Sequence, residues 1–139
     1  MKTKQKIFLL IMVIVIAAIA ISVVWYFSPR IFLSGIEPSD VKSISVFDGN
    51  TGKGFDISDT DEIRYIVENI QGCKMERDKV SIGYSGYRFC MCFCDEAEKE
   101  KESFTINSDN TIRKDPFFYR CDSGLCFDYL KELEEKYSN

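Results

Sequence analysis

The stretch YRFCMCFC, Tyr87 to Cys94, alternates large apolar side chains with arginine and cysteine. Successive side chains of a β-strand point to opposite faces, so this alternation predicts a strand. One face carries the apolar set, Tyr87, Phe89, Met91 and Phe93. The other, more open face carries Arg88 and three thiols, Cys90, Cys92 and Cys94. The apolar face is the better candidate for burial, and it needs a second layer of structure to cover it.

Other strand-like segments flank this stretch at short spacing. Residues 41–57 read as a hairpin, because apolar side chains alternate on both sides of the turn formers DGNTGKG. The same alternation predicts strands at residues 80–84, 104–106, 111–114 and 117–119. The charged run DEAEKEKE, residues 95–102, is expected to be a solvated connection.

Two segments have the period of an amphipathic helix. In residues 58–72 an apolar stripe is formed by Ile63, Ile66, Val67 and Ile70. Asp59 or Thr60 can cap its start, and Gly72 is suited to its end. Residues 125–137 carry a second stripe, formed by Cys126, Leu130, Leu133 and Tyr137.

These segments together predict an α+β domain. Consecutive strands joined by short links favour antiparallel pairing, and two one-sided helices need a sheet face to cover. We therefore expect an antiparallel sheet with both helices packed on one face, in the order β-β-α-β-β-β-β-α, or with residues 117–119 as one more strand before the last helix.

The N-terminal part of the chain has a different character. Residues 7–27 are almost entirely apolar and would span about 31 Å as a helix, close to the thickness of a bilayer core. Lys2, Lys4 and Lys6 precede this run, which places the N-terminus in the cytoplasm. The expected organisation is a cytoplasmic basic tail (1–6), a transmembrane helix (7–27), a linker (28–39) and an extracytoplasmic domain (40–139).

A cleaved signal peptide is the alternative, since Ala18 and Ala20 form a small-x-small site. The apolar run continues to Phe27, however, which favours an uncleaved anchor in the cell membrane. All 22 acidic residues and 15 of the 18 basic ones follow the run, a formal charge of −7. This charge disfavours nucleic acid as a partner.

The six cysteines leave three interpretations open. Cys90, Cys92 and Cys94 would form a thiol cluster on one strand face. Three thiols in line fit tetrahedral zinc poorly, although two neighbours could lean together, so no metal site is expected. Outside the cell, disulfides are possible, and Cys121 and Cys126 enclose a loop short enough to close. The simplest interpretation is a set of small apolar residues in an ordinary fold.

Other candidate sites are weaker. Asp48, Asn50 and Gly52 resemble the start of a calcium loop, but Lys53 stands where the tight turn needs glycine, so a hairpin turn is favoured. The aromatic run Phe117, Phe118 and Tyr119 is a candidate binding patch, against the interpretation of a final edge strand with mostly buried rings. The chain contains no histidine, which removes Ser-His and Cys-His catalysis, so we expect neither an enzyme nor a cofactor.

Four stretches carry a resemblance to a known group of proteins. They are VKSISVFDGNTGKGFDISDTDEIRYIVENIQ (41–71), GYRFCMCF (86–93), FTINSDNTIRKDPFFYR (104–120) and LCFDYLKELEE (125–135). Together they resemble small single-pass membrane-anchored proteins of Gram-positive Firmicutes, a family to which no activity is assigned. The resemblance covers most of residues 36–136 and implies the localisation and the fold only.

The expected function is that of an extracytoplasmic binding or regulatory module held on the cell membrane by residues 7–27. Its partner would be another envelope protein or a peptide, bound on the open sheet face or at an edge strand. The alternative is a thiol-based redox or envelope stress sensor that uses Cys90, Cys92 and Cys94.

Overall fold

The computed structural model describes residues 2–122 and 124–138 of the chain. The elements formed by these residues are α1 (Thr3–Phe27), the 3-10 helix η1 (Pro38–Asp40), β1 (Ser43–Asp48), β2 (Lys53–Ile57), α2 (Thr60–Gln71), β3 (Glu76–Val80), β4 (Phe89–Cys94), β5 (Glu100–Ile106), β6 (Thr111–Lys114), β7 (Phe117–Arg120) and α3 (Phe127–Tyr137).

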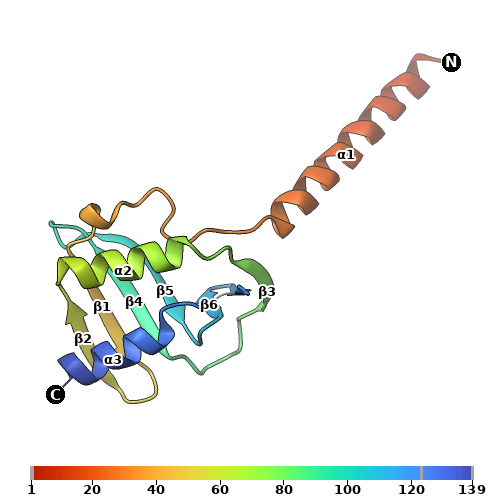
Figure 1. Cartoon of the computed structure of the whole chain (residues 1–139). Helices are drawn as coiled ribbons and strands as arrows, with labels where there is room; N and C mark the ends of the chain where they lie inside the picture. The colour runs from red at the N-terminus through yellow and green to blue at the C-terminus, as the bar shows by residue number, and fades with distance from the viewer. Residues whose placement is uncertain (1, 123, 139) are drawn as a thin grey trace.

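Within the described residues, seven strands form one antiparallel sheet in the order β2-β1-β4-β5-β6-β7-β3. Helices α2 and α3 both cover the same face of this sheet, and in Figure 1 they lie in front of its strands. The α+β prediction, with an antiparallel sheet and two amphipathic helices on one face, is therefore confirmed.

Strand β4 lies between β1 and β5 and sets the buried face of the sheet. Phe89, Met91 and Phe93 are fully buried. The helices cover them with the predicted apolar stripes, Ile63, Ile66, Val67 and Ile70 from α2 and Leu130 and Leu133 from α3. Burying each such side chain stabilises the fold by roughly 1.5–3 kcal/mol. Asp59 is the N-cap of α2, and its carboxylate accepts hydrogen bonds from the backbone N–H groups of Asp61 and Glu62.

The segment before β4 differs from the sequence prediction. The strand here is β3, Glu76–Val80, and not residues 80–84. Ile82 is 70% exposed and lies in a loop next to Gly83, whose φ of +92° turns the chain. The sequence of β3, ERDKV, has no alternation of apolar and polar residues, so this pattern does not predict the strand. Charged residues suit an edge strand, because they discourage pairing with other chains. Since β3 pairs with β7, the latter is not an edge strand.

Tyr87 and Arg88 also lie elsewhere than the alternation predicts. Strand pairing begins only at Phe89, so the two-residue period does not extend back to them. Tyr87 is exposed, and its ring lies 6.3 Å from that of Phe47. Arg88 turns toward the helix side, where its guanidinium contacts Glu134 of α3 at 3.7 Å.

The segment expected as a linker, residues 28–39, packs into the domain. Phe32 and Leu33 are fully buried in the core. Arg30 exchanges two backbone hydrogen bonds with Met75, of 2.8 and 2.9 Å. The carboxylate of Glu102 on β5 accepts a hydrogen bond from the backbone N–H of Leu33 at 2.9 Å. The chain between α1 and β1 is therefore fixed to the sheet and is not a free tether.

Helix α1 is attached to β3, which is an edge strand of the sheet. The guanidinium of Arg77 on β3 donates a hydrogen bond to the carbonyl oxygen of Tyr26 at 3.2 Å. It also lies 4.5 Å from the ring centre of Tyr26 and 4.4 Å from that of Phe117. Such cation–π contacts contribute about 0.5–1 kcal/mol each at exposed sites.

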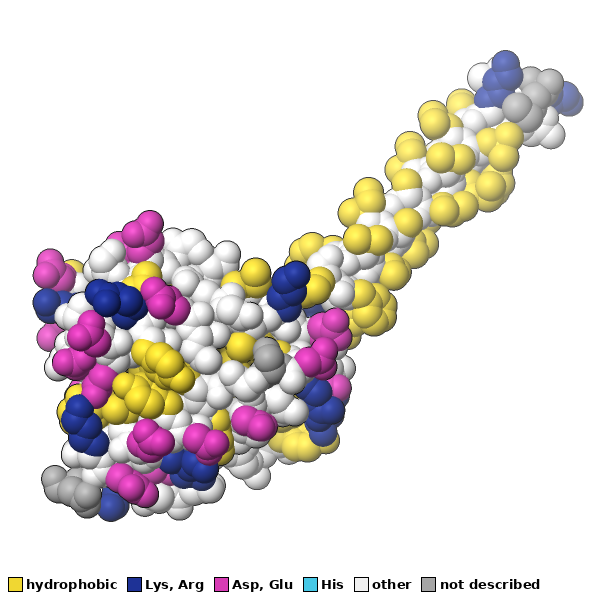
Figure 2. All heavy atoms as spheres, viewed as in Figure 1, with side chains coloured by type: hydrophobic (Ala, Val, Ile, Leu, Met, Phe, Trp, Pro, Cys, Tyr) yellow, Lys and Arg dark blue, Asp and Glu magenta, His cyan; other side chains and the backbone are white. Residues whose placement is uncertain are grey.

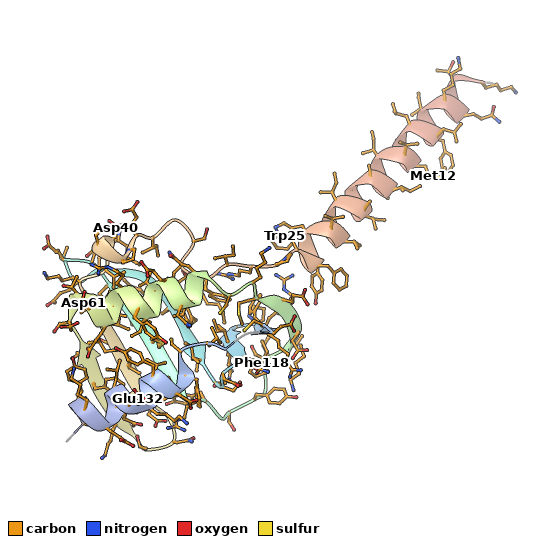
Figure 3. The ribbon with its side chains drawn as sticks, viewed as in Figure 1. Met12, Trp25, Asp40, Asp61, Phe118 and Glu132 are labelled. Carbon is orange, nitrogen blue, oxygen red and sulfur yellow. The ribbon has the colours of Figure 1, made fainter. Side chains whose placement is uncertain are left out.

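Beyond this contact α1 projects away from the domain, with Trp25 at its domain end and Met12 farther along (Figure 3). Hydrophobic side chains cover most of its length. Lys or Arg side chains lie at its N-terminal end, and Asp, Glu, Lys and Arg side chains are spread over the globular part (Figure 2). Among the described residues this is one helix long and apolar enough to cross a membrane, a test that a signal sequence also passes.

Candidate functional site

The face of the sheet opposite α2 and α3 carries the thiols predicted from the sequence. We call this face, formed by the outward side chains of β2, β1, β4, β5 and β6, the open face. The Cα register aligns Ser45 of β1, Cys92 of β4 and Ser103 of β5 in one row across it. Asp56 of β2 extends the row, and its carboxylate accepts a hydrogen bond from the hydroxyl of Ser45 at 2.6 Å.

A β-bulge in β5 adds a carboxylate to the open face. Phe93 pairs with Glu102, but the next residue of β4, Cys94, pairs with Glu100, so β5 has one extra residue at this point. Without the extra residue, alternation would place Glu100 and Glu102 on the same face. With it, Glu102 reaches the buried segment at Leu33, and Glu100 lies beside the thiols.

Two of the three predicted thiols are in contact. The Sγ atoms of Cys92 and Cys94 are 3.6 Å apart, and the Sγ of Cys92 lies 3.6 Å from Oε2 of Glu100. The other carboxylate oxygen of Glu100 accepts a hydrogen bond from the hydroxyl of Ser103 at 2.9 Å. Cys90 shares this face and is exposed.

Burial, Cys94 and Glu100 together raise the pKa of the Cys92 thiol to about 12, with burial the largest cause. The thiolate is the nucleophilic form of cysteine, so Cys92 is unreactive near neutral pH. This environment is the opposite of the cationic one that activates catalytic cysteines.

The open face is hollowed where its side chains are small. A hollow of about 520 Å³ is lined by backbone and side chains that include Ser45, Gly54, Asp56, Cys90, Cys92, Glu100 and Ser103. A second hollow, of about 310 Å³, lies toward β6 and shares Cys90 and Ser103 with the first. The two together make an elongated depression that crosses the strands from β2 to β6.

Two aromatic rings, those of Phe47 and Tyr87, lie beside this depression. Gly49 is what lets the Tyr87 segment approach the hairpin, because a Cβ at position 49 would lie 2.5 Å from the carbonyl oxygen of Tyr87. The backbone N–H of Gly49 also donates a hydrogen bond to the carbonyl oxygen of Arg88 at 2.8 Å. A residue with a side chain at position 49 would therefore displace Tyr87.

The other predicted cysteine pair lies on the opposite side of the sheet. Cys121 and Cys126 are both buried near the start of α3, and Cys126 precedes its first residue. Burial and, to a smaller extent, the nearby Cys73 raise the pKa of the Cys126 thiol to about 12. A disulfide between Cys121 and Cys126 stays a prediction.

The calcium-like sequence forms a hairpin turn. Oδ1 of Asp48 accepts a hydrogen bond from the backbone N–H of Asn50 at 2.8 Å and lies 3.0 Å from Nε of Arg88. Gly52 has a φ of +71°, which suits the turn. In the described part of the chain, no group of three or more Cys, Asp or Glu side chains is arranged to hold a metal ion.

The aromatic candidate patch is largely inside the fold. Phe118 and Tyr119 are buried, and Phe117 is half-buried against the core. The ring of Tyr119 packs against Phe32 at 5.2 Å, and that of Phe117 packs against Tyr26 at 6.0 Å. These side chains therefore stabilise the attachment of α1 and the segment after it.

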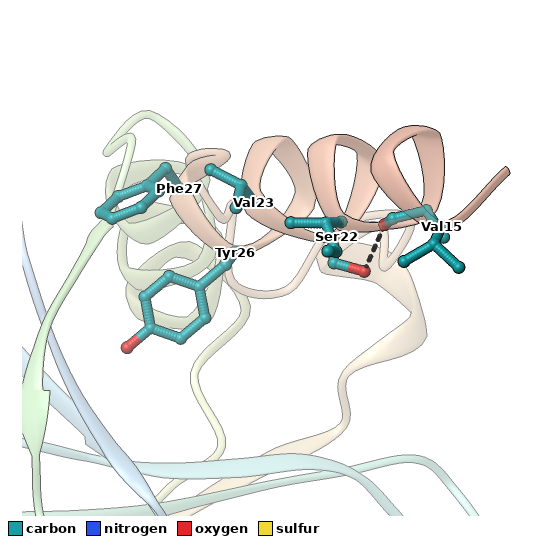
Figure 4. A pocket seen from close by; sticks show the side chains of 7 residues that line it. Val15, Ser22, Val23, Tyr26 and Phe27 are labelled. Atoms are coloured by element: carbon teal, nitrogen blue, oxygen red, sulfur yellow. Dashed lines mark hydrogen bonds between the residues drawn. The ribbon is translucent and has the colours of Figure 1, made fainter. Parts of the chain in front are cut away.

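A further hollow of about 520 Å³ lies along α1 and is lined by residues that include Ala18, Ser22 and Tyr26 (Figure 4). Its walls are side chains of that one helix, and the hydroxyl of Ser22 donates a hydrogen bond to the carbonyl oxygen of Ala18 at 2.8 Å. In a membrane, lipid chains would fill it, so we do not consider it a site.

Sequence reasoning missed Glu100, which contacts the thiol of Cys92, and Ser103, which donates a hydrogen bond to Glu100. The run from Asp95 to Glu102 carries no signal for a bulge, because charged residues alternate there without an apolar marker of register. No family model matches the chain, and no similar curated protein or solved structure is found. The resemblance to membrane-anchored proteins of Firmicutes therefore stays a prediction.

Proposed function

We propose that the protein is a membrane-anchored binding or regulatory module without catalytic activity, and that its open face binds an extended peptide segment of another envelope protein. The observation that carries this proposal is the elongated depression on a sheet face that neither α2 nor α3 covers. An extended segment matches this elongated shape. It would lie across the strands and contact their side chains, and it would not add a strand at the sheet edge.

The chemistry of the depression supports a peptide partner. Its floor is made of small side chains that include Ser45, Gly54 and Ser103, which lets a backbone approach closely. The carboxylates of Asp56 on β2 and Glu100 on β5 line the larger hollow and favour a cationic side chain there. Arg113, Lys114 and Asp115 line the end near β6. Asp115 pairs with Arg113 at 2.8 Å, so Lys114 leaves one net positive charge there, which favours an anionic group.

The anchor in this proposal is α1, with its basic tail in the cytoplasm and the globular domain outside. Three lysines stand before the apolar run, whereas Arg30 alone lies close behind it, and this asymmetry supports the orientation. The half-exposed Tyr26 and the exposed Trp25 stand at the domain end of the helix, where the membrane interface would lie.

Site-specific crosslinking in producing cells tests the binding face. A photoreactive phenylalanine analogue at Phe47 is expected to give a discrete adduct, whereas the same analogue at Tyr65, an exposed ring on α2, is expected to give none. In a second arm, Gly54→Gln fills the depression, and a Cβ at Gly54 meets only ordinary contacts of 3.6 Å or more. This change should reduce the Phe47 adduct. Equal adducts from both positions, or an adduct unaffected by Gly54→Gln, would contradict the proposal.

A thiol-based redox or envelope stress sensor is the second candidate, because the sulfurs of Cys92 and Cys94 are 3.6 Å apart. The raised pKa of Cys92 makes its own reaction with oxidants slow, since the thiol is the prevailing form. Differential alkylation of cells before and after oxidant treatment tests it. Reversible oxidation at these two positions supports the sensor, and permanently reduced thiols exclude it.

A further inference from the structure

The arrangement of the Cys92 and Cys94 side chains does not suit a disulfide bond between them. Both side chains leave the same face of one strand, two residues apart, and their sulfurs lie 3.6 Å from each other. A disulfide needs sulfurs about 2.05 Å apart with a dihedral near ±90°, which parallel side chains on an extended strand do not supply. An ion shared by the two sulfurs has no such torsional requirement.

The separation of the two sulfurs is close to that of two ligands on one metal ion. With metal–sulfur bonds of about 2.3 Å, sulfurs bound to one ion are about 3.8 Å apart at a tetrahedral angle and about 4.6 Å apart when the ion lies between them in line. Two-coordinate copper(I) favours the in-line arrangement, so the two sulfurs must move apart by about 1 Å from the observed 3.6 Å, and rotation of the two side chains about χ1 supplies this movement.

We propose that Cys92 and Cys94 chelate one soft, thiophilic metal ion of the copper(I) class as a pair of thiolates. This inference goes beyond peptide binding and does not depend on it. Copper(I) binds with two sulfur ligands, so it needs no third residue from the protein. A zinc ion would require more ligands than this pair provides.

The composition of the chain points to the same class of ion. The chain has no histidine, so the borderline imidazole ligand that suits zinc, nickel and copper(II) is absent. Thiolates suit both copper(I) and zinc, and the number of ligands separates the two, because zinc requires four and this pair provides two. The described residues also offer no group of three or more cysteine and carboxylate side chains for an ion with a higher coordination number.

Both thiols are partly exposed, so an ion can reach them from solvent. Cys92 and Glu100 line the hollow on the open face, which is open to solvent. Binding is a ligand exchange without electron transfer. One copper(I) ion and two thiols give a bis-thiolate complex and two protons, and the protons pass to water. Glu100 already accepts the S–H hydrogen bond of Cys92, which places an acceptor on the path of one of them.

Competition with a chromogenic copper(I) chelator tests this proposal on the full chain in detergent micelles under anaerobic conditions. We expect the wild-type chain to withdraw one copper(I) ion per chain. Cys92→Ser and Cys94→Ser should each weaken binding by about 100-fold, because the two-point attachment is lost. Cys90→Ser, on the same strand and face, is the matched control and should leave the affinity unchanged.

Circular dichroism melting shows whether each variant is folded, and Cys94→Ala provides a second substitution at the same position. Failure of the wild-type chain to withdraw copper(I) would overturn the proposal. An affinity that survives in folded Cys92→Ser or Cys94→Ala would overturn it too, as would an equal loss in Cys90→Ser. A ratio of one ion to two chains would show a bridging site and would contradict a chelate within one chain.

Discussion

At the scale of single residues, Asp48 is the most deeply buried charge of the described residues. Its side chain is fully buried, and its Oδ1 lies 3.0 Å from Nε of Arg88. Arg88 in turn reaches Glu134 of α3, which accepts a hydrogen bond from the hydroxyl of Thr51 at 2.8 Å. One ionic cluster therefore joins the β1–β2 turn, the start of β4 and the last helix.

Replacing Asp48 by Asn tests this cluster. The substitution keeps the shape and the acceptor for Asn50, but it leaves Arg88 without its nearest counter-charge. Breaking a buried ion pair costs about 3–5 kcal/mol, and the partial exposure of Arg88 places the expected loss near the lower value. Denaturant unfolding of the full chain in micelles measures it. Asp56→Asn, an exposed carboxylate on β2, is the control and should change stability by less than about 1 kcal/mol.

Glu62 forms a second link, between the first turn of α2 and the last turn of α3. Its carboxylate accepts hydrogen bonds from Nζ of Lys136 at 2.5 Å and from the hydroxyl of Tyr137 at 2.6 Å. These bonds raise the pKa of Lys136 and that of Tyr137 above their ordinary values. Glu62→Gln should lower the melting temperature by about 5 °C, the effect of one net hydrogen bond in a domain of this size.

The same link predicts an alkaline pH dependence. A group whose pKa is raised on folding contributes stability that is complete below its unfolded pKa and is lost as the pH rises through the folded value. For Lys136 and Tyr137 the ordinary pKa values are 10.5 and 10.0. The difference in melting temperature between the wild type and Glu62→Gln should therefore be constant from about pH 7 to 9 and shrink above about pH 10. A difference that grows at high pH would contradict this assignment.

At the scale of elements, the contact between α1 and β3 depends on Arg77. Its guanidinium contacts the rings of Tyr26 and Phe117 and binds the last turn of α1. Arg77→Ala should loosen α1 from the sheet while leaving the core intact. Spin labels in α1 and in β6 should then show a broader distance distribution by pulsed electron resonance. Arg64→Ala, an exposed arginine on α2, should leave the distribution as narrow as in the wild type.

Most elements could be predicted from the sequence, and the exceptions have physical causes. The core face of β4, the first hairpin and both domain helices follow from local periodicity, since one-sided burial imposes it. Strand β3 could not be predicted, because its charged residues are held by pairing with β7, far along the chain. The bulge that turns Glu100 toward the thiols also depends on cross-strand register. The thiol face was therefore predictable, but its carboxylate was not.

At the scale of the whole molecule, the proposed orientation places Cys90 outside the cell. This thiol is exposed on the open face. A membrane-impermeant maleimide should label Cys90 on intact producing cells, and Cys90→Ser should remove most of the signal. The remaining cysteines of the chain are buried or half-buried and react more slowly. Labelling that appears only after the cells are permeabilised would place the domain in the cytoplasm.

The packed segment between α1 and β1 has a consequence for how such a module would search for its target. If α1 spans a bilayer as proposed, the attachment of residues 28–39 and of Tyr26 to the sheet would hold the domain near one height and one tilt above the lipid, whereas a flexible linker would let it sample many. Encounters with a ligand would then depend mainly on lateral diffusion of the protein in the membrane and on rotation of the domain about the membrane normal. Ligands that present their binding segment at that height gain in local concentration, and those held closer to or farther from the bilayer are excluded by geometry alone.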